Sequence, residues 1–213
     1  MKKLVAVFGP SNSPSLRRRG QGVVSPAEHH HPPTPSFVRR GSLYDDAERL
    51  GSLLAQAGFT VVTGGYDGVM EAASKGAREA GGAAIGITAE VYFAKGREAN
   101  EYLTREIRVK SATDRLMELL DLPDTWCAIG NSTGTLAEVA MAWDYMTKGF
   151  IERKPLILIG PSWQGFFEYV RGEEQFKACQ DLIAYCETPE LAIGHLVECF
   201  GQQPRLPELE IIR

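Results

Sequence analysis

Residues 126–138 read Trp-Cys-Ala-Ile-Gly-Asn-Ser-Thr-Gly-Thr-Leu-Ala-Glu, and the fold class follows from this stretch. The apolar residues 126–129 predict a buried strand, the small residues 130–135 predict a turn, and a helical pattern covers residues 135–147. The first N–H groups of a helix lack intrahelical partners, and the helix dipole favours negative charge there. A strand, a small-residue turn and a helix N-terminus in this order are typical of a phosphate-binding site.

Two further turns of the same kind lie upstream in the sequence. A strand over residues 3–8 is followed by Gly9-Pro10-Ser11, and a strand over residues 60–62 is followed by the glycine-rich residues 63–68. The carboxyl ends of parallel strands meet at one edge of a sheet. Three such turns therefore predict a single binding crevice at that edge.

The rest of the chain continues the alternation of strands and helices. The predicted strands are residues 3–8, 60–62, 83–87, 126–129, 156–159 and 182–185. The predicted helices are residues 42–57, 69–80, 111–120, 135–147, 164–171 and 189–200. We expect the first helix to begin at a capping box, Ser42-Leu43-Tyr44-Asp45, and residues 89–110 receive no assignment. This alternation predicts one α/β domain over residues 1–213, a doubly wound, Rossmann-like parallel sheet with helices on both faces.

Residues 14–41 interrupt this pattern between the first strand and the first helix. The segment is rich in proline and arginine: Pro14, Arg17, Arg18, Arg19, Pro26, Pro32, Pro33, Pro35, Arg39 and Arg40. Such a composition predicts an insertion or a flexible loop outside the core. Its arginines form either a solvated basic loop, which is favoured, or a lid that reaches for phosphate. A metal site at His29, His30 and His31 is disfavoured, because adjacent side chains point in different directions.

The overall composition argues against several classes of protein. The 213 residues carry a net charge of -4, which disfavours nucleic-acid binding by a basic surface. The N-terminal apolar run is too short for a signal peptide and no later run is long enough to span a bilayer, so no membrane contact is expected. The four cysteines lack Cys-x-x-Cys spacing. This spacing favours reduced thiols in the cytoplasm over disulfides or a zinc site, and we expect no metal.

Two motifs make the chain resemble the LOG ("Lonely Guy") family over nearly its whole length, apart from residues 14–41 and the C-terminal tail. The family signature Pro-Gly-Gly-x-Gly-Thr-x-x-Glu corresponds to residues 130–138, and the element Gly-Gly-x-x-Gly-[Leu/Val]-Met-x-Ala corresponds to residues 64–72. The resemblance implies that Arg115 and Glu138 are the catalytic residues. The expected phosphate- and nucleotide-binding residues are Gly9, Ser11, Gly64, Gly65, Gly68, Met70, Gly130, Asn131, Ser132, Thr133, Gly134 and Thr135.

The resemblance also implies an activity and its partners. LOG-like enzymes hydrolyse the N-glycosidic bond of a nucleoside 5′-monophosphate, such as AMP or a cytokinin ribotide, to the free base and ribose 5-phosphate. They use no cofactor and assemble as homodimers or larger homo-oligomers. The alternative is a protein of the same fold that binds a nucleotide or cofactor without catalysis, a carrier or sensor such as a molybdenum-cofactor carrier.

Three departures from the family pattern keep both functions open. Gly130 replaces the proline of the signature, Asn131-Ser132 replaces the glycine pair, and Leu116 replaces a lysine that often follows the arginine. Serine adopts left-handed backbone angles poorly, so the altered turn favours the non-catalytic alternative. The retained arginine and glutamate favour the hydrolase.

The two implied catalytic residues each have a simpler structural interpretation. Glu138 either stabilises the cation-like ribosyl state and activates water, or it only closes a capping box with Thr135. Arg115 either clamps the phosphate or the ribose, or it forms a surface pair with Glu118 on the same helix. The family match favours the functional role in both cases.

Overall fold

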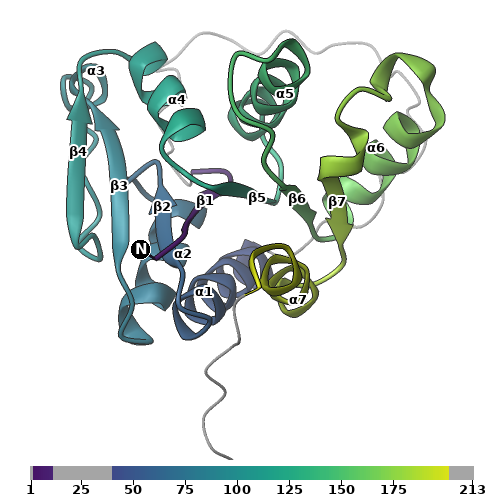
Figure 1. Ribbon diagram of the computed structural model, residues 1–213. Coiled ribbons are helices and arrows are strands. Elements are labelled where there is room, and N and C mark those ends of the chain that lie inside the picture. The colour runs from purple at the N-terminus through teal and green to yellow at the C-terminus, as the bar shows by residue number, and fades with distance from the viewer. Residues whose placement is uncertain (1, 12–39, 202–213) are drawn as a thin grey trace, which may run out of the picture.

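The computed structural model describes residues 2–11 and 40–201, and its centre is a seven-stranded sheet (Figure 1). The strands are β1 (Leu4–Phe8), β2 (Thr60–Thr63), β3 (Ala84–Ala89), β4 (Arg105–Val109), β5 (Thr125–Ile129), β6 (Leu156–Ile159) and β7 (Ile183–Cys186). Their order is β4-β3-β2-β1-β5-β6-β7, and every neighbouring pair is parallel. The direction of winding reverses at β1, which lies between β2 and β5.

Helices cover both faces of this sheet, which confirms the predicted doubly wound α/β fold. The helices are α1 (Arg40–Gln56), α2 (Val69–Glu79), α3 (Glu90–Phe93), α4 (Ala112–Asp121), α5 (Thr133–Lys148), α6 (Pro161–Gly172) and α7 (Pro189–Phe200). Short 3-10 turns occupy Glu174–Phe176 and Gln180–Leu182. In Figure 1, α1, α2 and α7 lie below the sheet and α4, α5 and α6 lie above it, whereas the short α3 lies beside the ends of β3 and β4.

The central strands are apolar throughout because both of their faces are buried. In β1, Val5 and Val7 pack with α1, α2 and α7, whereas Ala6 and Phe8 pack with α4, α5 and α6. A strand that is covered on both sides reads as a continuous apolar run, as β1 and β6 do. The sheet therefore has two hydrophobic cores, one on each face.

The predicted elements all form, with ends shifted by no more than three residues, but two sequence expectations were incomplete or wrong. The unassigned residues 89–110 contain α3 and β4. Helix α1 begins at Arg40, so Ser42 lies inside the helix and the predicted capping box at its start is wrong. Residues 40 and 41 thus belong to a helix, and the remainder of the predicted insertion, residues 14–39, lies outside the described residues.

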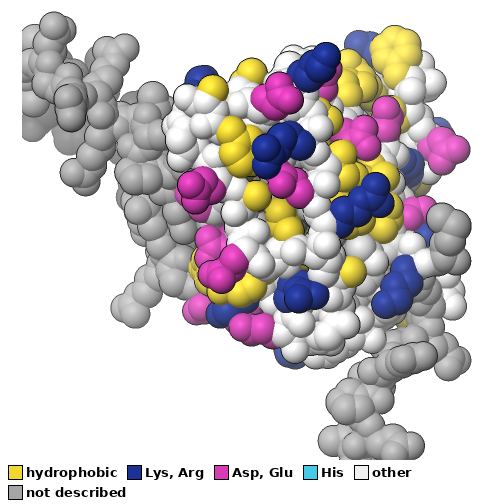
Figure 2. All heavy atoms as spheres, turned by 90° about the vertical axis from the view of Figure 1, so that its left-hand side faces the viewer, with side chains coloured by type: hydrophobic (Ala, Val, Ile, Leu, Met, Phe, Trp, Pro, Cys, Tyr) yellow, Lys and Arg dark blue, Asp and Glu magenta, His cyan; other side chains and the backbone are white. Residues whose placement is uncertain are grey.

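Charged side chains of both signs mix over the face that carries β4 and α3 (Figure 2). The four cysteines, Cys127, Cys179, Cys186 and Cys199, are free thiols. Within the described ranges, no His, Cys, Asp and Glu side chains gather in a group of three that could hold a metal ion, and His29–His31 lie outside those ranges. None of the helices described is long and apolar enough to cross a membrane.

Candidate functional site

The turns that follow β1, β2 and β5 meet at the carboxyl edge of the sheet, where the winding reverses. A Cβ on Gly9 would lie 2.8 Å from the carbonyl oxygen of Ile129, so the β1 turn passes close to the end of β5. The N–H of Val69 donates to the carbonyl oxygen of Pro10 at 3.0 Å, which ties the β1 turn to the start of α2. Gly68 is the N-cap of that helix. This reversal point is where open α/β sheets bind their ligands.

Arg115 projects from the first turns of α4 toward β2 and β3. Ser111 and Asp114 form a complete capping box that fixes the start of this helix. The Arg115 Nε donates to the carbonyl oxygen of Ile87 at 2.8 Å. The guanidinium therefore turns into the protein, and the alternative of a surface pair with Glu118 is wrong.

The guanidinium of Arg115 rests against two residues of the upstream motif. Its Nη2 atom lies 3.5 Å from the sulfur of Met70. The same atom fills the space where a Cβ on Gly64 would stand. In the described part of the chain, Arg115 has no ion-pair partner. The structure thus brings two of the predicted site residues, Gly64 and Met70, against a third, the guanidinium of Arg115.

A second arginine, which the sequence analysis missed, shares the surroundings of Arg115. The Arg97 guanidinium lies 5.5 Å from the ring centroid of Tyr66 and 5.7 Å from that of Tyr92. The corresponding distances for Arg115 are 5.4 and 5.8 Å. Arg97 also donates to the Ser11 hydroxyl at 3.0 Å, so the predicted residue Ser11 joins this group. We refer to Arg97, Arg115, Tyr66 and Tyr92 as the arginine–tyrosine cluster.

Hydrogen bonds from Asn100 hold the segment that contains Arg97 against the turn that follows β2. The N–H of Asn100 donates to the carbonyl oxygen of Gly65 at 2.9 Å, and its side-chain amide donates to the carbonyl oxygen of Tyr66 at 3.0 Å. The Tyr66 hydroxyl in turn accepts from the N–H of Ala89 at 2.9 Å. Tyr66 is only 1% exposed, so its buried ring is a fixed surface on which both guanidinium groups lie.

Glu138 lies on α5, close enough to Arg115 for each charge to act on the other. Burial raises the pKa of Glu138 to about 7, and the positive charge of Arg115 opposes this rise. Burial lowers the pKa of Arg115, which the charge of Glu138 opposes. The two side chains form no direct ion pair in the described structure. A carboxyl group with a pKa near neutrality is suited to proton transfer.

The N-terminus of α5 is capped by Ser132, a residue of the turn that precedes the helix. The N–H of Thr135 donates to Ser132 Oγ at 3.1 Å, and the two hydroxyl oxygens lie 2.9 Å apart. Ser132 is therefore the N-cap, and a capping box between Thr135 and Glu138 is wrong. Thr135 is 1% exposed. Thr133 and Gly134 are exposed residues of the first helical turn, and their N–H groups have no intrahelical partners.

The same turn is also fastened to α6. The indole nitrogen of Trp163 donates to the carbonyl oxygen of Gly130 at 3.0 Å, and the Asn131 side chain donates to the carbonyl oxygen of Ser162 at 3.4 Å. Gly130 has a φ of 66°, a left-handed angle that a proline in its place would not adopt. The departures from the family signature thus belong to one consistent local structure.

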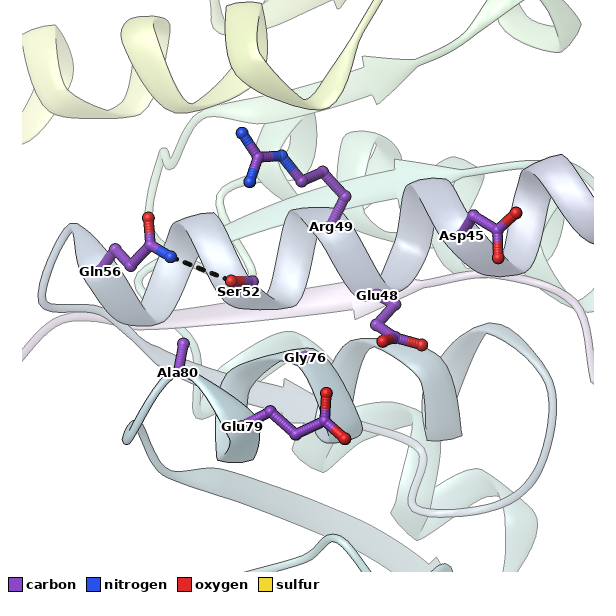
Figure 3. Close-up of a pocket in the computed structure, with 8 residues that line it drawn as sticks. All are labelled: Asp45, Glu48, Arg49, Ser52, Gln56, Gly76, Glu79 and Ala80. Carbon is purple, nitrogen blue, oxygen red and sulfur yellow. Dashed lines mark hydrogen bonds between the residues drawn. The ribbon is translucent and has the colours of Figure 1, made fainter.

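A hollow elsewhere on the molecule contains none of the predicted site residues. Figure 3 shows that α1 and α2 line this space, which measures about 420 Å³. Three of its four charged groups already have partners: Glu48 binds Lys75 and Arg49 binds Glu190, each at 2.9 Å, and Glu79 lies 4.0 Å from Lys75. The arrangement of charges therefore favours the carboxyl edge of the sheet as the functional site.

Comparison with known proteins supports the fold and identifies the family. The molybdenum cofactor binding protein from Rippkaea orientalis is 23% identical, with a TM-score of 0.67 over 94% of this chain and 98% of its own. The molybdenum cofactor carrier protein from Chlamydomonas reinhardtii is 22% identical, with a TM-score of 0.66 over 95% and 100%. An uncharacterized protein of Archaeoglobus fulgidus is 27% identical over 143 residues, which are 67% of this chain and 84% of that protein. Residues 36–193 match the model of the SLOG cluster4 family, which confirms the resemblance to LOG proteins, and the chain belongs to the SLOG cluster4 family.

Proposed function

We propose that this protein binds a phosphorylated, nucleotide-like small molecule at the carboxyl edge of β1, β2 and β5 and acts as its carrier or sensor. The observation that carries this proposal is the placement of Arg115. Its guanidinium is fixed by the Ile87 carbonyl oxygen and the Met70 sulfur but has no described carboxylate partner. A preorganised guanidinium of this kind is a strong contact for a phosphate.

The turn before α5 favours retention of the ligand over its cleavage. In the LOG signature, glycines leave the first helical N–H groups open, whereas here Ser132 engages both the N–H and the hydroxyl of Thr135. Fewer donors are then free to hold a phosphate in one fixed position relative to Glu138. Precise positioning contributes strongly to catalysis, and its loss affects turnover more than binding. The names of the two similar structures add the molybdenum cofactor to the ligands worth testing.

Hydrolysis of a nucleoside 5′-monophosphate is the second candidate, and the pKa of Glu138 favours it. In this reaction the bond between C1′ and the base nitrogen breaks, and positive charge develops on the ribose. The Glu138 carboxylate would stabilise that charge and accept a proton from water. The resulting hydroxide adds to C1′, and the departing base takes up the proton that Glu138 accepted. The products are the free base and ribose 5-phosphate.

One experiment separates these candidates. The purified protein is titrated calorimetrically with AMP, a cytokinin ribotide and isolated molybdenum cofactor, and the nucleotide mixtures are then analysed by chromatography for free base. Binding without release of base supports the carrier or sensor. Release of base that disappears in Glu138→Gln supports the hydrolase. If none of the three ligands binds, the proposed function is wrong.

A matched pair of arginine variants controls this experiment. Arg115→Ala is expected to weaken binding, whereas Arg108→Ala removes the same charge from a residue that pairs with Glu106 on β4. Equal binding by both variants would contradict the role of Arg115. The homodimer and the cytoplasmic location that the sequence analysis expects stay predictions.

A further inference from the structure

Arg97 is a cation in the site that neither family motif contains. It lies in the segment between α3 and β4, which hydrogen bonds from Asn100 hold against the β2 turn. Its side chain lies over Tyr66 and Tyr92, the two rings that Arg115 also approaches. Ser11 accepts one of its N–H groups, so the Ser11 hydroxyl proton remains available to another acceptor.

The arginine–tyrosine cluster has more positive than negative charge. Neither Arg97 nor Arg115 has an ion-pair partner within the described ranges. Burial lowers the pKa of Arg115, and the charge of Arg97 adds to that effect. Glu138, with a pKa of about 7, is only partly ionised at neutral pH and balances less than one of the two charges. Two guanidinium groups in such surroundings are stabilised by a bound anion.

We propose that Arg97 and Arg115 together bind the phosphate of the ligand, with the Ser11 hydroxyl as an additional donor. This inference rests on the proposed function and assigns the phosphate to the β1 and β2 side of the site. A phosphate monoester carries between one and two negative charges near neutral pH and accepts several hydrogen bonds, which matches two guanidinium groups and a hydroxyl. The self-capped turn before α5 then faces another part of the ligand.

The test compares a nucleotide with its nucleoside. Calorimetric dissociation constants for AMP and adenosine are measured with the unaltered protein, Arg97→Gln, Arg97→Lys and the control Arg108→Gln. Arg97→Gln is expected to weaken AMP binding about tenfold or more and to leave adenosine binding within about twofold, since a charge-assisted hydrogen bond is lost. Arg97→Lys restores part of the AMP affinity because the charge is kept. Arg108→Gln changes neither constant.

The discrimination between AMP and adenosine separates a phosphate contact from a structural role. If Arg97 only holds its segment in place, Arg97→Gln weakens the binding of AMP and of adenosine equally. That result overturns the inference. It is also overturned if Arg97→Gln binds AMP normally while Thr135→Glu does not, because the phosphate then lies at α5. In both cases the proposed ligand binding survives. An unaltered protein that binds no AMP overturns both the inference and nucleotide binding as the function.

Discussion

The guanidinium of Arg115 occupies the space that a side chain on Gly64 would need. The two residues come from different elements, the β2 turn and α4, and are 51 positions apart in the sequence. Gly64, in the upstream motif, has no Cβ, and the guanidinium of Arg115 can therefore reach the edge of the sheet. The two positions are expected to behave as one functional unit.

Gly64→Ala is therefore expected to weaken ligand binding about as much as Arg115→Ala does. The new methyl group displaces the guanidinium from the Ile87 carbonyl oxygen. The double variant should lose little more than either single variant, because residues that act through one contact are not additive. Calorimetric titration with AMP measures all three variants. Additive losses would show that Gly64 acts independently of Arg115.

Gly134→Ala is the matched control for this substitution. A Cβ on Gly134 would meet only Ser132 Oγ, at an ordinary contact distance of 3.7 Å. Alanine also has a better helix propensity than glycine by about 1 kcal/mol. We expect unchanged or higher stability and normal placement of Arg115.

Glu138 is expected to make stability depend on pH in an unusual direction. Its folded pKa of about 7 lies above the ordinary value of 4.5, so the unfolded chain releases the proton first as the pH rises. Folding stability is thus highest below pH 4.5 with respect to this group and falls as the pH rises to about 7, by up to about 3 kcal/mol. Glu138→Gln, which does not ionise, should gain stability relative to the unaltered protein between pH 5 and pH 8.

Urea denaturation of both proteins across this pH range measures the effect. The difference in the free energy of unfolding should grow with pH and level off above about pH 8. A difference that stays constant would mean that the pKa of Glu138 is not raised in the folded protein. Thermal unfolding at the same pH values provides an independent check.

Ser132 is expected to stabilise the turn before α5 through its hydroxyl. Ser132→Ala leaves the N–H of Thr135 without its acceptor, and loss of an N-cap costs about 1 kcal/mol. Ser132→Thr keeps a hydroxyl at the same position and should cost less. The melting temperatures of the two variants test this expectation, and equal melting temperatures would contradict the capping role.

Lys154 is expected to stabilise the end of α4. Its ammonium group donates to the carbonyl oxygens of Asp121 at 3.1 Å and Pro123 at 2.8 Å. Lys154→Met removes both hydrogen bonds and should cost about 1–3 kcal/mol in the free energy of unfolding. Lys148→Met is the control, because Lys148 forms an exposed pair with Asp144 whose loss costs less than about 1 kcal/mol. Urea denaturation distinguishes the two variants.

The sequence predicted the buried strands better than the exposed one. Strands such as β6 are apolar at every position, which is a clear signal even over four residues. Strand β4 reads Arg-Glu-Ile-Arg-Val and lies at the edge of the sheet, where its outward residues meet solvent. Alternating charges in so short a segment do not distinguish a strand from a loop. The short α3 before it has too few residues for a helical period.

The motifs located part of the site, and tertiary structure determined the rest. Arg115 came from the family resemblance, and the structure shows its contacts. Arg97 has no local pattern to mark it, because its position depends on the hydrogen bonds between Asn100 and the β2 turn. The choice of Ser132 as N-cap was similarly hidden, since neighbouring Thr133 and Thr135 are also good capping residues. The left-handed backbone of Gly130 sets the direction in which the chain enters the helix, and with this direction Ser132 takes the N-cap position.

Trp163 gives the chain an intrinsic fluorescence probe of the candidate site. Its indole is 2% exposed and donates to Gly130, the first residue of the turn before α5. The other two tryptophans donate elsewhere, Trp126 to Leu119 and Trp143 to Ala178. A ligand that shifts the turn therefore perturbs the fluorescence emission of one indole in three. Occupancy of the site becomes readable from unlabelled protein at low concentration, and rapid mixing makes the arrival of the ligand observable in time.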